Sequence, residues 1–121
     1  MINSVHHVSL IISDLEKSRV FYQNILGLTV VEDRPDLGFE GLWLKVGEQQ
    51  IHLLLLDNPD PVHGRPQHGG RDRHVACTVT DFEQLVDRLE QGNVSYTLSR
   101  SGRKALFCRD PDGNALEFIG V

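Results

Sequence analysis

Residues 7–16 read HVSLIISDLE, and residues 74–83 read HVACTVTDFE. The two stretches align without a gap at an offset of 67 residues (74 − 7), and both begin with His-Val. Each runs through a short β-like segment into Ser/Thr-Asp-x-Glu, which is typical of the start of a helix. The chain therefore contains an internal repeat, and the copies begin with the same strand and the same helix.

Both copies continue in the same way. Ser13 and Thr80 are the predicted N-caps, because a glutamate follows each of them three residues later, as a capping box requires. Apolar residues at near-helical spacing then predict helices over 14–26 and 81–91, each followed by a glycine. Three strand-like runs follow each helix, over residues 28–34, 39–46 and 49–56 in the first copy and 94–99, 103–109 and 114–119 in the second. The predicted unit is β-α-β-β-β, used twice.

These elements predict an α+β fold of two βαβββ modules in a pseudo-twofold arrangement, with mixed sheets that curve around a metal site. The chain of 121 residues has the length of a single domain. We assign module one to residues 1–56, a linker to 57–72 and module two to 73–121. The linker holds three of the five prolines, and its composition fits a plain connector and a functional flap equally well.

Composition argues against several classes of partner. The net charge is −5 and no run of Lys or Arg is present, so nucleic acid is not an expected partner. The apolar stretches are far too short to span a membrane, and no signal peptide is evident. Cys77 and Cys108 lie in apolar strand-like runs, which is typical of reduced thiols in a cytoplasmic protein.

Strand alternation predicts where four side chains point. In the first strand of each module one face is uniformly apolar and should pack against the helix, so His7 and His74 point the other way. In the last strand of each module, His52 and Glu117 alternate with large apolar residues and also point away from the helix. A lone histidine on a strand is usually only a polar residue, but four such residues at equivalent positions of a repeat predict a metal site. A buried Glu117 would be costly without a cation as its partner.

Two segments carry a family resemblance. HHVSLIISDLEKSRVFYQNILGL (residues 6–28) and RDPDGNALEF (residues 109–118) resemble the vicinal oxygen chelate superfamily, also called the glyoxalase/bleomycin-resistance/dioxygenase superfamily. The resemblance covers the whole chain. It implies that His7, His52 and His74, together with Glu117, hold a divalent cation whose open positions take two neighbouring oxygens of a small-molecule substrate. It also implies a homodimer, since many small members are dimers.

The resemblance leaves the reaction open. Nitrogen and oxygen ligands together favour one first-row ion, such as Zn, Ni, Co, Mn or Fe. The first expectation is a glyoxalase-type lyase or isomerase, in which the metal stabilises an enolate or oxyanion and Glu117 or His52 moves a proton. Glyoxalase I-like enzymes usually have a glutamate where this chain has His52, which counts against that chemistry. The alternatives are an Fe(II) ring-cleaving dioxygenase, a thiol transferase like the fosfomycin-resistance enzymes, and a non-catalytic resistance protein that sequesters its ligand.

A basic cluster gives the candidate substrate-binding residues. Arg100, Arg103 and Lys104 lie close together near a predicted hairpin. Such a cluster can bind a carboxylate, a phosphonate or a thiol cofactor, although a solvated turn is the favoured explanation.

Overall fold

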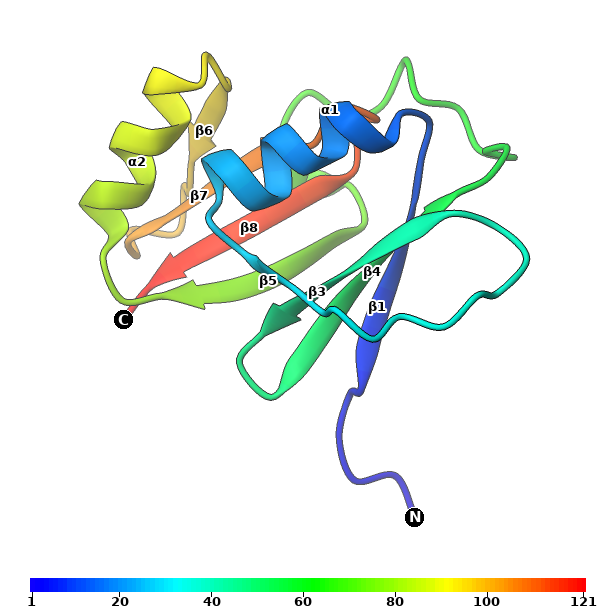
Figure 1. Cartoon of the computed structure of the whole chain (residues 1–121). Helices are drawn as coiled ribbons and strands as arrows, with labels where there is room; N and C mark the ends of the chain where they lie inside the picture. The colour runs from blue at the N-terminus through cyan, green and yellow to red at the C-terminus, as the bar shows by residue number, and fades with distance from the viewer. The chain divides into compact units, whose positions relative to one another are not determined.

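The structure, a computed structural model, describes residues 1–121 and divides into two compact units, Met1–Pro59 and Asp60–Val121. Each unit contains one four-stranded mixed sheet and one main helical segment (Figure 1). The predicted α+β fold of two βαβββ modules is therefore confirmed. The boundary lies inside the predicted linker 57–72, most of which belongs with the second unit.

The first unit has the strand order β1-β4-β3-β2. β1 pairs in parallel with β4, and the other neighbours pair antiparallel. The first and last strands of the module are thus adjacent, which is what places their side chains together. The elements are β1 (His7–Ile12), α1 (Leu15–Arg19), the π-helical segment η1 (Val20–Ile25), β2 (Thr29–Val30), β3 (Gly41–Val46) and β4 (Gln49–Leu55).

The second unit repeats this topology with the order β5-β8-β7-β6. β5 and β8 are the parallel pair, so the first and last strands are again neighbours. The elements are the short 3-10 helix η2 (Gly69–Arg71), β5 (His74–Val79), α2 (Phe82–Gln91), β6 (Tyr96–Leu98), β7 (Ala105–Arg109) and β8 (Ala115–Gly120). No helix in either unit has the length and apolar character needed to cross a membrane.

The N-cap prediction was wrong by one residue in both helices. Asp14, not Ser13, caps α1 by accepting a hydrogen bond from the Lys17 N–H at 2.9 Å. Asp81, not Thr80, caps α2 in the same way, at 3.0 Å from the Gln84 nitrogen. Asp serves as an N-cap as well as Ser or Thr does, so the local sequence left two adjacent candidates for each helix.

The edge strands are shorter than predicted. Residues 28–34 contribute only the two-residue strand β2, and residues 94–99 only the three-residue strand β6. After Val31 the chain leaves the sheet for an irregular loop, which Arg34 closes by donating to the Phe39 carbonyl at 2.9 Å. An edge strand has a single pairing partner, so its length depends on that partner more than on its own composition.

Each sheet has an apolar core face, as the alternation predicted, but β7 and β8 are buried on their other face as well, where Phe107 and Glu117 lie. In the first unit Leu42, Leu44, Ile51 and Leu53 are at most 3% exposed. In the second unit the buried sheet residues include Leu106, Leu116 and Phe118, and α2 contributes Phe82, Leu85 and Leu89. Burial of each such side chain is worth about 1.5–3 kcal/mol.

Both cysteines are free thiols: Cys108 is buried and Cys77 is half-buried. Burial raises the pKa of Cys108 to about 12, so that thiol remains protonated and unreactive at neutral pH.

Candidate metal site

In the first unit, the repeat brings His7 and His52 together. β1 and β4 run in parallel with Ser9 opposite His52, so His7 lies one diagonal step away on the same face of the sheet. The two imidazole rings stack with their centroids 3.9 Å apart and their planes 16° from parallel. Trp43 of β3 stacks on His52 as well, at 4.0 Å. The two histidines that the sequence predicts as ligands therefore lie side by side.

His52 is held as a neutral imidazole. Burial, followed by the nearby His7, lowers the pKa of His52 from its ordinary value of 6.5 to about 4. Its Nε2 lies 2.7 Å from the Gln50 side-chain oxygen, which can only accept, so Nε2 carries the hydrogen and Nδ1 keeps a lone pair. A neutral imidazole with a free lone pair is the form that binds metal ions.

His6 adds a contact to this pair that was not part of the predicted site. The Nδ1 atoms of His6 and His7 lie 2.8 Å apart, so one of them donates a hydrogen bond to the other. The two rings meet edge to face, with their centroids 5.1 Å apart.

The second unit forms the matching pair by the same strand register. Ala76 lies opposite Glu117 in the parallel pair β5–β8, so His74 is the diagonal neighbour of the glutamate. Nε2 of His74 lies 3.3 Å from Oε1 of Glu117. Glu117 is only 3% exposed although it is acidic, so its carboxylate requires partners.

The hydrogen bonding of His74 fits a metal ligand. Nδ1 of His74 is 2.9 Å from the backbone carbonyl oxygen of Asp72, which can only accept, so Nδ1 carries a hydrogen. In the neutral ring Nε2 then presents a lone pair toward an oxygen of Glu117. A metal-ligating histidine typically donates its other ring N–H to a carbonyl or a carboxylate in this way.

The spacing of the two donors also fits. Two ligands bound at about 2.1 Å, at roughly 90–110° to each other, would lie about 3.0–3.5 Å apart. The His74–Glu117 separation of 3.3 Å lies within that range. No cluster of three or more His, Cys, Asp or Glu side chains is arranged to hold a metal, so the predicted ligands stand as two pairs, one in each unit.

The three predicted substrate-binding residues have three different surroundings. Arg103 donates from Nη2 to Oε2 of Glu117 at 2.7 Å, so it contacts a predicted metal ligand directly. Lys104 instead pairs with Glu83 of α2 and lies over the ring of Phe82. Arg100 lines a separate pocket. The sequence could not show these different partners, because the contacts of Arg103 and Lys104 join segments far apart in the chain.

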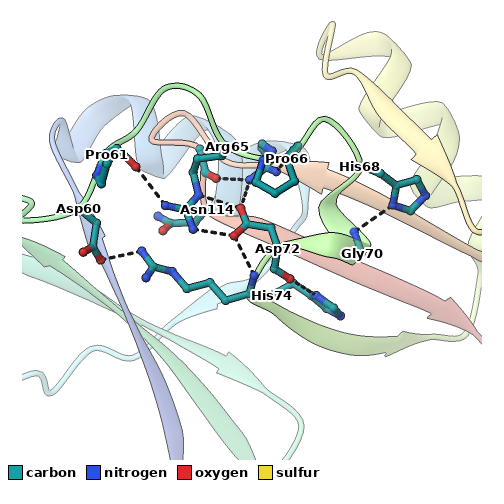
Figure 2. A network of polar contacts seen from close by, with 12 residues as sticks. Asp60, Pro61, Arg65, Pro66, His68, Gly70, Asp72, His74 and Asn114 are labelled. Carbon is teal, nitrogen blue, oxygen red and sulfur yellow. Dashed lines mark hydrogen bonds and ion pairs between the residues drawn. The ribbon is translucent and has the colours of Figure 1, made fainter.

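A network around Asp72 was missed by the sequence analysis (Figure 2). Arg65 binds both carboxylate oxygens of Asp72, at 2.6 and 2.7 Å, and Nη1 of Arg109 donates to Oδ2 at 2.8 Å. The hydrogen bonds from Arg65 are the main reason that the pKa of Asp72 lies well below its usual range. Because the backbone carbonyl of Asp72 also accepts from His74, the network holds the part of the chain that orients this predicted ligand.

Comparison with known protein families identifies the family of this chain. The model of the Glyoxalase/Bleomycin resistance protein/Dioxygenase superfamily matches residues 4–118. The chain belongs to this superfamily. The superfamily includes metal-dependent enzymes, in keeping with the donor set described above.

Relatives in the superfamily differ in their reactions. The glutathione transferase FosA of Serratia marcescens is 34% identical, over 97% of this chain and 80% of its own length. A lactoylglutathione lyase of Neisseria meningitidis is 29% identical, over 93% of this chain and 87% of its own length. A glyoxalase family protein from Bacillus anthracis shares the fold with a TM-score of 0.81, at 23% identity over 99% of this chain and 96% of its own.

Proposed function

We propose that this protein is a divalent-metal-dependent enzyme that acts on a small, oxygen-rich substrate. The observation that carries the proposal is the second pair of candidate ligands. Nε2 of His74 and Oε1 of Glu117 face each other at 3.3 Å, and Nδ1 of His74 is bonded to a backbone carbonyl. Two electron-pair donors that face each other at this distance repel, and a cation that binds both of them removes this repulsion.

We assign the metal to four side chains, His7, His52, His74 and Glu117, and expect a first-row ion such as Zn, Ni, Co, Mn or Fe. When bound, the metal supplies Lewis-acid chemistry, stabilising negative charge on a substrate oxygen. His52 is already neutral, so it needs no deprotonation before it binds. Arg103 holds Oε2 of Glu117 and leaves Oε1 as the ligand atom.

The surroundings of Glu117 and His52 help to decide between an isomerase reaction and a transfer reaction. An isomerase must remove a proton from carbon, and the sequence suggested Glu117 or His52 for that role. Both oxygens of Glu117 already have partners, Arg103 and His74. The pKa of His52 is about 4, so its ring is a weak base at neutral pH. These contacts favour a transfer reaction that needs no carbon base.

We therefore place thiol transfer ahead of the lyase or isomerase reaction. In such a transfer a thiolate sulfur attacks an electrophilic carbon, the carbon–oxygen bond breaks, and the oxygen keeps the electron pair and takes up a proton. The FosA relative, at 34% identity, supports this choice. The lyase remains the second candidate because a lactoylglutathione lyase is 29% identical over 93% of the chain.

The metal assignment is tested by elemental analysis of protein purified without chelator. We expect one first-row metal per chain in the wild type, and its loss in His74→Ala and Glu117→Gln. His63→Ala and Glu16→Gln are matched controls, because both residues are exposed and lie outside the two pairs. Full metal content in His74→Ala and Glu117→Gln would remove the basis of the proposal.

The reaction is tested on the metal-loaded enzyme with two substrate classes. One assay follows the methylglyoxal–glutathione hemithioacetal, and the other follows addition of glutathione or cysteine to a small anionic epoxide. Product from the epoxide alone supports thiol transfer. Product from the hemithioacetal alone reverses the order of the two candidates.

A further inference from the structure

The second unit contains a pocket of about 530 Å³ that is not part of the metal-ligand pairs. Its walls come from two segments: the stretch that precedes β5, including His68 and Arg71, and the hairpin between β6 and β7, including Arg100. Phe107 of β7 also lines it. All of these residues lie in the second unit, so the pocket belongs to one compact body.

The pocket is positively charged. Arg71 and Arg100 line it, and no aspartate or glutamate does. Neither guanidinium group forms a hydrogen bond or an ion pair with the protein, in contrast to Arg65, Arg103 and Arg109. Two unpaired guanidinium groups beside one hollow repel each other and are stabilised by an anion that binds both of them.

His68 adds a hydrogen-bond donor without a partner. Its Nδ1 accepts a hydrogen bond from the Gly70 N–H at 3.0 Å, so in the neutral ring the hydrogen is on Nε2. That Nε2 is buried from solvent and has no hydrogen-bond partner. Buried donors are nearly always paired in folded proteins, so an unpaired one in the wall of a pocket indicates an acceptor that comes from a ligand.

Phe107 joins the pocket to the second ligand pair. Its ring lies 4.9 Å from the His68 ring and meets the His74 ring edge to face at 5.3 Å. On the sheet, Phe107 is also the register partner of Glu117. A small molecule that filled the pocket would therefore lie one aromatic ring away from His74.

We propose that this pocket is an oxyanion-binding subsite, in which Arg71, Arg100 and the His68 ring bind a carboxylate or phosphate group of a small molecule whose carbon part packs on Phe107. The inference deepens the proposed function by naming the charge of the substrate or of a co-substrate. It does not depend on the metal, because none of these side chains is one of the assigned ligands.

The test uses the metal-free full-length protein, labelled with ¹⁵N, and two probes at constant ionic strength: inorganic phosphate and acetate. Saturable shifts of the His68 ring nitrogens with at least one probe are the expected result, and the tighter probe identifies the preferred group. Arg71→Gln and Arg100→Gln should each weaken binding about tenfold, the loss expected for a hydrogen bond between charged groups. Lys17→Gln, the same change of charge at an exposed site in the first unit, should leave binding unchanged.

Two results would overturn the inference. One is the absence of a saturable shift at His68 with both probes. The other is equal weakening in Lys17→Gln and the two arginine variants, which would show a general charge effect only. Because both arginines are exposed and unpaired, neither variant should disturb folding. Loss of anion binding with normal metal content would leave the proposed metal site intact, so the two proposals fail separately.

Discussion

Replacement of Asp72 by asparagine tests whether the arginine network stabilises the second unit. The side chain of Asp72 is 7% exposed and is bonded to Arg65, which is 18% exposed, and Arg109, which is 25% exposed. The asparagine side chain would keep the shape and one acceptor oxygen but would lose the negative charge between two cations. Breaking a fully buried ion pair costs about 3–5 kcal/mol. Because water still reaches both arginines, we expect a smaller loss, about 2 kcal/mol.

The effect should depend on pH in a defined direction. The pKa of Asp72 in the folded protein lies below its unfolded value, which is about 3.9 for aspartate. The stabilisation is therefore fully present above about pH 4 and is lost as pH falls from there toward the folded pKa. The stability difference between wild type and Asp72→Asn should be constant near neutral pH and should narrow in acid.

Urea denaturation followed by circular dichroism at a series of pH values measures both effects. Asp60→Asn is the matched control, because Asp60 pairs with Arg73 on the surface, where the two side chains are 46% and 65% exposed. An exposed pair of this kind should contribute less than about 1 kcal/mol. Equal losses in the two variants, or an Asp72→Asn protein as stable as wild type at pH 7, would refute the argument that burial makes this network important.

Three further predictions concern the proposed site and assembly. First, His52→Glu should raise methylglyoxal–glutathione turnover, which we expect to be weak or absent in the wild type, because it restores a second carboxylate; strong wild-type turnover that survives His52→Ala would contradict this. Second, Arg103→Leu should destabilise the metal-free protein by about 1–2 kcal/mol, because Glu117, at 3% exposure, loses its guanidinium partner. Arg103→Lys should lose less, and saturating Zn²⁺ should restore much of the loss in thermal denaturation; no difference between the leucine and lysine variants would argue against a charge effect. Third, the protein should be a homodimer by sedimentation equilibrium at micromolar concentration, because exchange of similar modules between chains is a low-cost route to a dimer; a monomeric mass would rule this out.

The sequence by itself determined the repeat, the order of the elements and the face on which each candidate ligand lies. Alternation along a strand is a local property, so the positions of His7 and His52 on one face follow from their own neighbours. The parallel pairing of the first and last strands in each module then brings each pair together. The family resemblance, carried by residues 6–28 and 109–118, was confirmed by a model match over residues 4–118.

Tertiary structure alone decided the partners of the charged and polar groups. Nothing near Arg103 or Lys104 in the sequence shows that one binds Glu117 and the other Glu83, since these contacts join segments far apart in the chain. The low pKa of His52 likewise arises from burial and from His7 on a neighbouring strand. The strength of a charge interaction depends on distance and burial in three dimensions. The alternation of apolar and polar residues along a strand, by contrast, is visible in the sequence itself. For that reason the fold and the proximity of His7 to His52 and of His74 to Glu117 could be predicted, and the network around Asp72 could not.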